Sequence, residues 1–187
     1  MNKFIDIVKV DLKTHISYPY LPDEKIKLSI YSFIKSYIDI DFRVVFLFRL
    51  SQFLLNKNFK KLSLLIYFRL KSRYNIDISP FCKIENGFKI VHAFNIVIGS
   101  GAKIGSNFVC FNNVNIGNKK IGWRQSHRND EMPTIGKNVV VAPQNIIVGN
   151  INIVNNISIH ANQVISNDIN NNDKISNYKF SKILNDQ

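Results

Sequence analysis

The most regular feature of the chain is an aliphatic residue that recurs every six positions in its second part. A period of six fits neither an α-helix nor an ordinary alternating strand. A strand of about four residues followed by a two-residue turn has this period, and three such sides close a coil of about eighteen residues. We therefore predict stacked triangular coils with one aliphatic side chain per side on the axis. The predicted inward positions are Ile78, Ile84 and Ile90, then Ile98, Ile104, Cys110 and Ile116, and finally Ile135, Val141, Ile147, Ile153, Ile159 and Ile165.

Two interruptions break the repeat into three runs. The spacing from Ile90 to Ile98 is eight residues, which inserts two extra residues at a corner. The spacing from Ile116 to Ile135 is nineteen residues, which predicts a protruding loop at 117–134. Long loops and insertions on a rigid scaffold usually carry function.

The turns of the coil require residues that tolerate positive φ, which are mainly glycine and asparagine. All eight glycines of the chain lie between Gly87 and Gly149. We expect the turns at glycines that directly follow inward positions and at asparagine pairs between them, such as Gly99, Gly105, Gly136, Asn112–Asn113 and Asn155–Asn156.

The first 75 residues contain no glycine and are expected to be helical. Asp23 predicts the N-cap of a helix that begins near Glu24, with Ile26, Ile30, Phe33, Ile34 and Tyr37 on one face. Further helices are expected within 42–55 and 59–70. The expected organisation is a helical region at 1–75, a β-helical region at 76–170 and a tail at 171–187, which makes a mainly β fold.

The formal charge of +12 favours an anionic partner. Residues 1–75 hold 14 basic and 6 acidic residues, which suits an acidic polymer or an anionic membrane surface, although charge runs are usually solvated faces. We see no signal peptide, transmembrane-length apolar segment or nucleic-acid-binding motif in the sequence. Its two cysteines, Cys82 and Cys110, form no disulfide framework. These features predict a cytoplasmic protein, with peripheral contact to the inner membrane as an open alternative, and no nucleic-acid partner.

A specific motif lies at the start of the repeat. The segment Asp77-Ile78-Ser79-Pro80 is followed by His92, fifteen residues after the aspartate and inside the first interruption. With this motif and the six-residue repeat, the chain resembles the hexapeptide-repeat acyltransferases, whose fold is a left-handed parallel β-helix. It is most similar to the serine acetyltransferases and to their relatives that acetylate bacterial capsular and other surface polysaccharides. The resemblance implies acetyl-CoA as the donor, no metal, and a homotrimer with its active site between subunits.

The resemblance implies that His92 is the general base and that Asp77 accepts a hydrogen bond from its other ring nitrogen. The alternative is a corner histidine that caps a loop and a solvated aspartate. Serine acetyltransferases have a second active-site histidine before the proline that ends the long loop, where this chain has Met132, and an aspartate before the first histidine, where it has Val91. Both departures favour a sugar hydroxyl over L-serine as the acceptor.

Four residues of the long loop are candidates for acceptor binding or catalysis. His127 is a substitute for the missing second histidine, or a solvated loop residue. Trp123, Arg124 and Arg128 suit contact with a sugar, with adenine or with a neighbouring subunit, and an anchoring role for the loop is equally open.

The resemblance places the CoA arm along small residues, since the pantetheine must approach the backbone closely. Ala142, Gly149 and Ala161 match these small residues, whereas His160 stands where the family often has glycine and would border the pantetheine. Near the end of the chain, Lys182 matches a lysine that would meet the CoA phosphates. A zinc site built from His92, His127 and His160 lacks the usual ligand spacing and is not expected. Cys110 occupies an inward position, so we expect a core residue there. The sequence therefore predicts an acetyl-CoA-dependent O-acetyltransferase of a bacterial capsular or other surface polysaccharide. The alternatives are a serine O-acetyltransferase and a non-catalytic β-helix scaffold.

Overall fold

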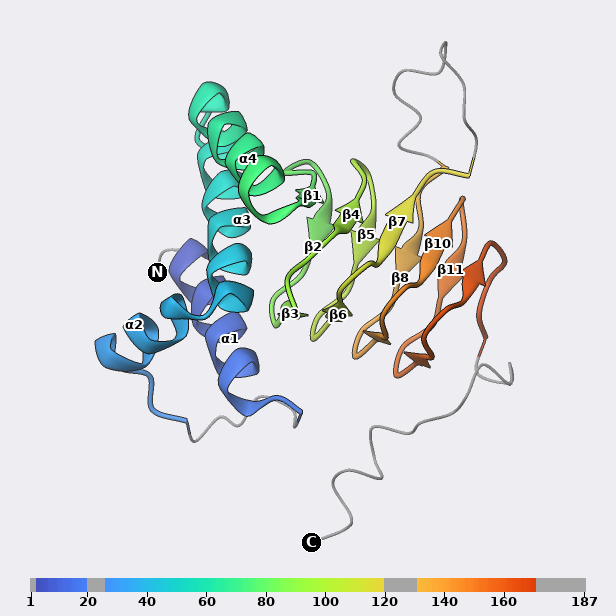
Figure 1. Ribbon diagram of the computed structural model, residues 1–187, viewed down its shortest axis with the longest axis horizontal. Helices are drawn as coiled ribbons and strands as arrows, with labels where there is room; N and C mark the ends of the chain where they lie inside the picture. Colours follow the sequence, from blue (N-terminus) through green and yellow to red (C-terminus); the bar gives the residue numbers. More distant parts are fainter. Residues whose placement is uncertain (1–2, 20–25, 120–130, 171–187) are drawn as a thin grey trace, which may run out of the picture.

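The β-helical part of the chain winds through three parallel sheets that form the faces of a triangular prism (Figure 1). The structure is a computed structural model, and it describes residues 3–19, 26–119 and 131–170. The first sheet has five strands and the other two have four each. The first sheet consists of β1 (Ile76–Ile78), β4 (Ile96–Ile98), β7 (Asn115–Gly117), β10 (Ile146–Val148) and β13 (Val164–Ile165). The second consists of β2 (Lys83–Ile84), β5 (Lys103–Ile104), β8 (Thr134–Ile135) and β11 (Asn152–Ile153), and the third of β3 (Lys89–Val91), β6 (Val109–Phe111), β9 (Val140–Val141) and β12 (Ser158–Ile159).

The predicted inward positions form the core of the prism. Strand register places them directly above one another, as in the column Ile78, Ile98, Ile116, Ile147 and Ile165. All thirteen predicted positions are buried, with at most 7% of the residue exposed. The stacked aliphatic column predicted from the six-residue period is confirmed.

Asparagines shape the corner between the second and third sheets. Asn107, Asn138 and Asn156 have positive φ values of 56°, 54° and 61°. Their side-chain amides form a ladder, because Asn107 donates to Asn138 at 3.0 Å and Asn138 donates to Asn156 at 2.8 Å. The predicted use of asparagine at positive φ is confirmed here, and the ladder gives each amide a partner in the next coil.

The glycines that follow inward positions have a different role from the predicted one. Gly99, Gly105 and Gly136 are not among the residues of the described chain with positive φ. A Cβ atom added to Gly136 would lie 2.5 Å from the Asn155 side-chain oxygen and 2.8 Å from backbone of the next coil. Gly105 and Gly136 need glycine because the backbone of the next coil approaches them closely, whereas Gly99 faces the methyl group of Met132.

Four helices precede the prism: α1 (Lys3–Ser17), α2 (Ile30–Ile38), α3 (Ile40–Asn56) and α4 (Lys60–Tyr74). The helix expected near Glu24 is wrong in its start, because α2 begins at Ile30 and residues 26–29 are not helical. Ser29 is its N-cap, and the Ser29 and Ser32 side chains each accept from the other residue's backbone N–H. In the described part of the chain, no helix is both long and apolar enough to cross a bilayer.

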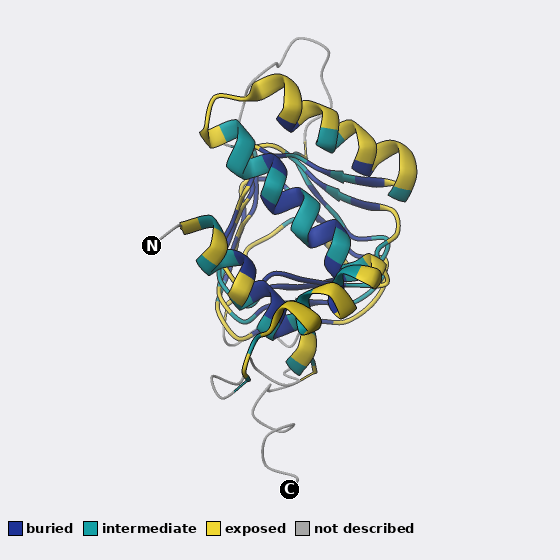
Figure 2. Ribbon diagram, turned by 90° about the vertical axis from the view of Figure 1, so that its left-hand side faces the viewer, coloured by how far each residue is buried: buried dark blue, intermediate teal, exposed yellow. Residues whose placement is uncertain are grey.

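The helices close the open end of the prism, and α3 runs across it (Figure 2). Val44, Val45 and Phe48 of α3 are buried and belong to the same hydrophobic core as the aliphatic column. Phe48 contacts Phe88 with 6.0 Å between ring centroids, and Phe88 stacks on Phe108 of the next coil at 5.9 Å. The helical cap and the first coils therefore share one core.

A buried ion pair joins the cap to the first coil. The guanidinium of Arg49 on α3 donates to the Asp11 carboxylate of α1 at 2.8 Å, and both side chains are at most 3% exposed. Arg49 also donates to the carbonyls of Ile84 and Glu85, at 2.7 and 2.6 Å. Asp11 accepts the backbone N–H groups of Gly87 and Phe88, at 2.7 and 2.9 Å. One ion pair thus connects α1, α3 and the turn between β2 and β3.

Replacing one partner of this pair should destabilise the whole chain. We predict that Asp11→Asn lowers the free energy of unfolding by about 3–5 kcal/mol, because the Arg49 charge would remain buried without its counter-ion. Urea denaturation followed by circular dichroism measures the loss. Glu85→Gln, which removes an exposed carboxylate of the same turn, is the matched control and should change stability by less than about 0.5 kcal/mol. Equal stability of the two variants would contradict the structural role of the pair.

Candidate active site

His92 lies at the corner between the third and first sheets, in the two-residue insertion after β3. Its backbone is left-handed, with φ of 59°, a conformation that few residues other than glycine adopt and that Asn, Asp and His adopt more often than the rest. The residue is exposed, and its ring approaches Phe111 of β6 edge-on with centroids 6.3 Å apart. The insertion therefore projects an imidazole from the prism, as the sequence predicted, and Phe111 supports one side of it.

A carboxylate from the helical cap holds the backbone of this corner. Asp41, in the first turn of α3, accepts the N–H of His92 at 2.9 Å with one oxygen and the N–H of Ala93 at 2.7 Å with the other. Unusual backbone conformations persist when the surrounding structure over-determines them, and they cluster at functional sites. Asp41 supplies this constraint for His92.

Asp41 is in turn connected to a partly buried network. Its own N–H donates to the side chain of Asp39, the N-cap of α3, at 3.0 Å. The Asp39 carboxylate lies 3.3 Å from Nε2 of His15, and Nδ1 of His15 lies 3.0 Å from Nζ of Lys89. Burial, reinforced by the neighbouring Lys89 charge, lowers the pKa of His15. The neutral ring of His15 accepts a hydrogen bond from Lys89 of β3 and donates one to Asp39, the N-cap of α3. His15 therefore connects β3 to the start of α3.

In the structure the Asp77 carboxylate has partners other than the predicted His92, so the pairing of Asp77 with His92 stays a prediction. Asp77 lies on β1, and its carboxylate accepts from Tyr67 and, at 2.6 Å, from Lys71, both on α4. The structure shows no hydrogen bond or ion pair between Asp77 and the His92 imidazole. Asp77 lies on β1 and His92 follows β3, so the two residues belong to the first and third sides of the first coil. Helix α4, which packs beside β1, supplies the partners of the Asp77 carboxylate.

Three of the residues predicted to bind CoA lie along the same edge of the prism as His92. Ala142 follows β9, and His160 and Ala161 follow β12, so all three succeed strands of the third sheet, as His92 does. Ala142 is half-buried, while His160 and Ala161 are exposed. Gly149 follows β10 instead and lies at the corner between the first and second sheets. The structure therefore brings three predicted residues to one edge and separates the fourth from them.

The long loop leaves the prism at the edge that holds Gly149, between β7 and β8. The predicted residues Trp123, Arg124, His127 and Arg128 lie outside the described residues, as does Lys182 in the tail. Met132, which occupies the position of the second histidine of serine acetyltransferases, is 8% exposed and belongs to the core. Its methyl group lies 2.6 Å from the position that a Cβ atom on Gly99 would take, so this side chain packs against the coil.

The cysteines are structural. Cys110 and Cys82 are buried, and burial raises the pKa of the Cys82 thiol to about 12 and that of Cys110 further. A thiol with a raised pKa is a poor nucleophile near neutral pH. In the ranges 3–19, 26–119 and 131–170, no group of three or more His, Cys, Asp or Glu side chains is arranged to hold a metal ion.

The main residue that the sequence interpretation missed is Asp41. Its only sequence signal is its place in the acidic start of a helix, Asp39-Ile40-Asp41, which predicts capping and favourable interaction with the helix dipole. Its contact with His92 spans 51 positions. Hydrophobic periodicity gives no information on such a contact.

The comparisons with known proteins point in one direction. No family model matches the chain. It is similar to serine acetyltransferase of Buchnera aphidicola, with 32% identity over 118 residues that cover 63% of this chain and 42% of that protein. It is also 37% identical over 90 residues to serine acetyltransferase of Staphylococcus epidermidis, covering 48% of this chain and 40% of that one.

The similarity to solved structures extends over more of the chain. Serine acetyltransferase 1 of Entamoeba histolytica has a TM-score of 0.73 at 24% identity. The superposition covers 90% of this chain and 61% of the Entamoeba chain. Isoform 3 of the same organism, solved in complex with cysteine, has a TM-score of 0.69 at 26% identity, with 89% of this chain and 55% of its own covered.

These similarities establish the fold but not the whole activity, because the chain spans less than half the length of the curated relatives described above. The predicted left-handed parallel β-helix is confirmed. The chain has the fold of the serine acetyltransferases and is similar to them in sequence over about two-thirds of its own length.

Proposed function

We propose that the chain is an acetyl-CoA-dependent O-acetyltransferase with His92 as its general base. The observation that carries this proposal is the exposed His92 at the interrupted corner, held by Asp41 and aligned with small residues on the same edge. The sequence similarity to serine acetyltransferases supports the same reaction. One of the similar structures is a serine acetyltransferase in complex with CoA, with a TM-score of 0.70.

The chemistry needs only one base. The imidazole of His92 removes the proton from the acceptor hydroxyl, and the oxygen attacks the thioester carbonyl of acetyl-CoA. The C–O bond forms, the C–S bond breaks, and the CoA thiolate takes the proton back from the imidazolium. We propose that Ala142 and Ala161 leave room for the pantetheine arm and that His160 borders it. Asp41 acts as a positioning residue, because it fixes the backbone from which the imidazole projects.

L-serine is the first acceptor to test, because the relatives favour it over the glycan acceptor preferred in the sequence analysis. A sugar hydroxyl remains the second candidate for one specific reason. Met132, at the position of the second histidine of serine acetyltransferases, is buried in the core, so that position offers no side chain to an amino-acid substrate.

The geometry also supports the predicted homotrimer as part of the proposal. The described ends of the long loop join the prism at the edge between the first and second sheets, whereas His92 lies at the edge between the third and first. A loop that starts on one edge reaches a base on another most directly from a neighbouring subunit. Closed rings of identical subunits form interfaces of this kind between different surface patches.

The first prediction concerns the base. We expect His92→Ala to lower kcat for acetyl transfer by about 10²–10⁴-fold, as loss of a general base does. Release of free CoA thiol from acetyl-CoA measures the rate, with L-serine and then bacterial polysaccharides as acceptors. Because His92 is exposed, circular dichroism and thermal unfolding should match wild type. An active variant with either acceptor class would refute the assignment, and the acceptor that drives thiol release decides between the two candidates.

The second prediction concerns Asp41. We expect Asp41→Asn to lower kcat by about tenfold to a hundredfold. The amide oxygen can accept only one of the two N–H groups, those of His92 and Ala93, so the His92 imidazole should move from its position. The KM for acetyl-CoA should stay within about twofold of wild type, because Asp41 bonds to the corner of His92 and Ala93 and not to the residues proposed to line the pantetheine arm. Asp168→Asn is the matched control, because Asp168 is exposed and likewise accepts a backbone N–H, that of Asn152 at 2.8 Å.

A double-mutant cycle separates positioning from a general structural effect. If Asp41 acts through His92, Asp41→Asn should cause no further loss of kcat in the His92→Ala background. An equal loss in both backgrounds would show that Asp41 only stabilises the fold.

A further inference from the structure

One stretch of the helical cap combines many cations with no carboxylate. Residues 42–76 contain eight Lys and Arg residues and no Asp or Glu. Two of the eight are neutralised by contacts to other elements, Arg49 by Asp11 and Lys71 by Asp77. The remaining six are Arg43, Lys57, Lys60, Lys61, Arg69 and Arg73. The chain's positive charge is therefore concentrated on α3, α4 and the turn between them.

The same stretch exposes large apolar side chains. All residues from 56 to 62 are exposed, so the whole α3–α4 turn is open to solvent. Phe59 and Leu62 are 57% and 50% exposed, and Leu65 and Phe68 further along α4 are 65% and 59% exposed. Figure 2 shows that α4 packs on the prism with one side and presents the other to solvent. Exposed Phe and Leu side chains interspersed with lysines are typical of helices that lie in a membrane interface.

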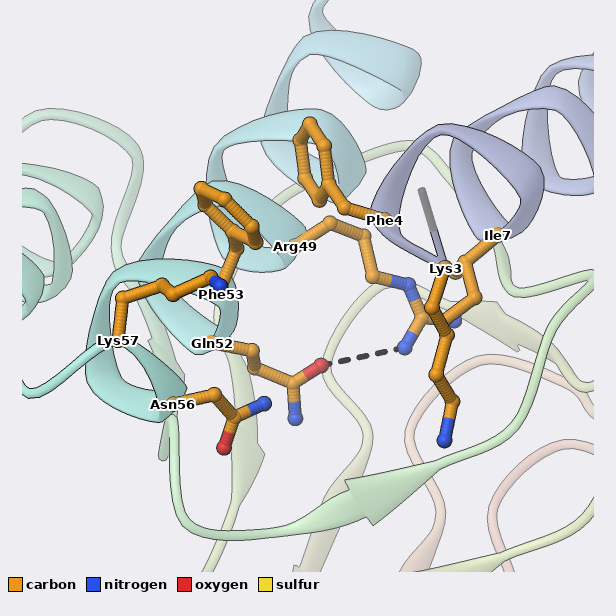
Figure 3. A pocket seen from close by; sticks show the side chains of 8 residues that line it. All are labelled: Lys3, Phe4, Ile7, Arg49, Gln52, Phe53, Asn56 and Lys57. Atoms are coloured by element: carbon orange, nitrogen blue, oxygen red, sulfur yellow. Dashed lines mark hydrogen bonds between the residues drawn. The ribbon is translucent and has the colours of Figure 1, made fainter. Parts of the chain in front are cut away.

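A cavity of about 440 Å³ opens beside this turn, between α1 and α3 (Figure 3). Lys3 of α1 lies on one side of it, and Gln52 and Asn56 of α3 lie on the other with Lys57, the C-cap of α3. The remaining lining residues are Phe4, Ile7, Arg49 and Phe53, so none of the eight carries a carboxylate. The cavity offers two ammonium groups and side-chain amides beside apolar walls, which suits a phosphate group attached to an apolar molecule.

We propose that the α3–α4 turn, the outer side of α4 and this cavity form a docking surface for a bilayer that contains anionic phospholipid. Phe59, Leu62 and Leu65 enter the interface, the lysines contact lipid phosphates, and the cavity takes one headgroup. Charge selects this occupant over a second copy of the chain, because a second copy would bring the same cations to the contact and α4 has no acidic residue to pair with them. The apolar side chains between the lysines favour a bilayer over nucleic acid, whose phosphate backbone needs only the charges.

Sedimentation with vesicles tests the proposal on the full-length chain without any assay of catalysis, so its outcome is independent of the proposed function. We expect binding to vesicles of equal phosphatidylcholine and phosphatidylglycerol, and none to phosphatidylcholine alone. Binding should weaken in high salt, since surface charges are screened. Absence of binding to the anionic vesicles in low salt would overturn the proposal.

Paired variants test the location of the surface. We expect Lys60→Glu with Lys61→Glu to lower the apparent partition coefficient by about tenfold or more. The matched control is Lys83→Glu with Lys103→Glu, which reverses the same charges at two exposed lysines on adjacent strands of the second sheet and should change binding by less than about threefold. Phe59→Ser with Leu62→Ser should also weaken binding, whereas Phe81→Ser, at a comparably exposed Phe on the prism, should not.

Two results would overturn this placement. The first is equal binding of the surface and control variants. The second is that replacing Phe59 and Leu62 changes the molecular mass measured by sedimentation equilibrium and leaves vesicle binding unchanged. This face would then be an interface between copies of the chain.

Discussion

The buried pair of Arg49 and Asp11 is the interaction on which the arrangement of the molecule depends. The aliphatic column would stack without it, because each coil contacts only its neighbours. What the pair adds is a fixed position for α1 and α3 relative to the first coil, since the two side chains bond to both helices and to four backbone groups between Ile84 and Phe88. A buried pair of this kind specifies a geometry more clearly than it adds net stability.

That fixed geometry extends to the candidate active site. Arg49 and Asp41 lie on the same helix, so the contact that anchors α3 also sets where the Asp41 carboxylate meets the corner of His92. The β-helix supplies the interrupted corner, and the cap supplies the group that holds it. The proposed activity therefore depends on both regions, although the resemblance to acyltransferases rests mainly on the repeats.

The sequence predicted the repeat region in detail, whereas in the helical region it predicted the helices within 42–55 and 59–70 but not how the helices pack. A period of six over thirteen positions leaves few ways to bury the aliphatic residues, so fold and core follow from it. The helices carry apolar residues on more than one side. Ile30 and Ile34, which the spacing placed on one apolar face, are exposed, and so are Leu62 and Leu65 of α4.

The candidate site was predictable only in part. His92 was identified from its motif and the insertion. Its carboxylate partner was assigned to Asp77 by spacing, but Tyr67 and Lys71 of α4 bind that group. Asp41 comes from a separate element, and only the three-dimensional packing brings it to the corner.

The most direct test of this account is a crystal structure of the chain with CoA bound. We predict that the CoA thiol lies within hydrogen-bonding reach of the His92 imidazole, with the pantetheine along the edge of Ala142 and Ala161 and with both Asp41 oxygens still bonded to the corner. A thiol bound at another edge of the prism, away from every copy of His92, would contradict the account.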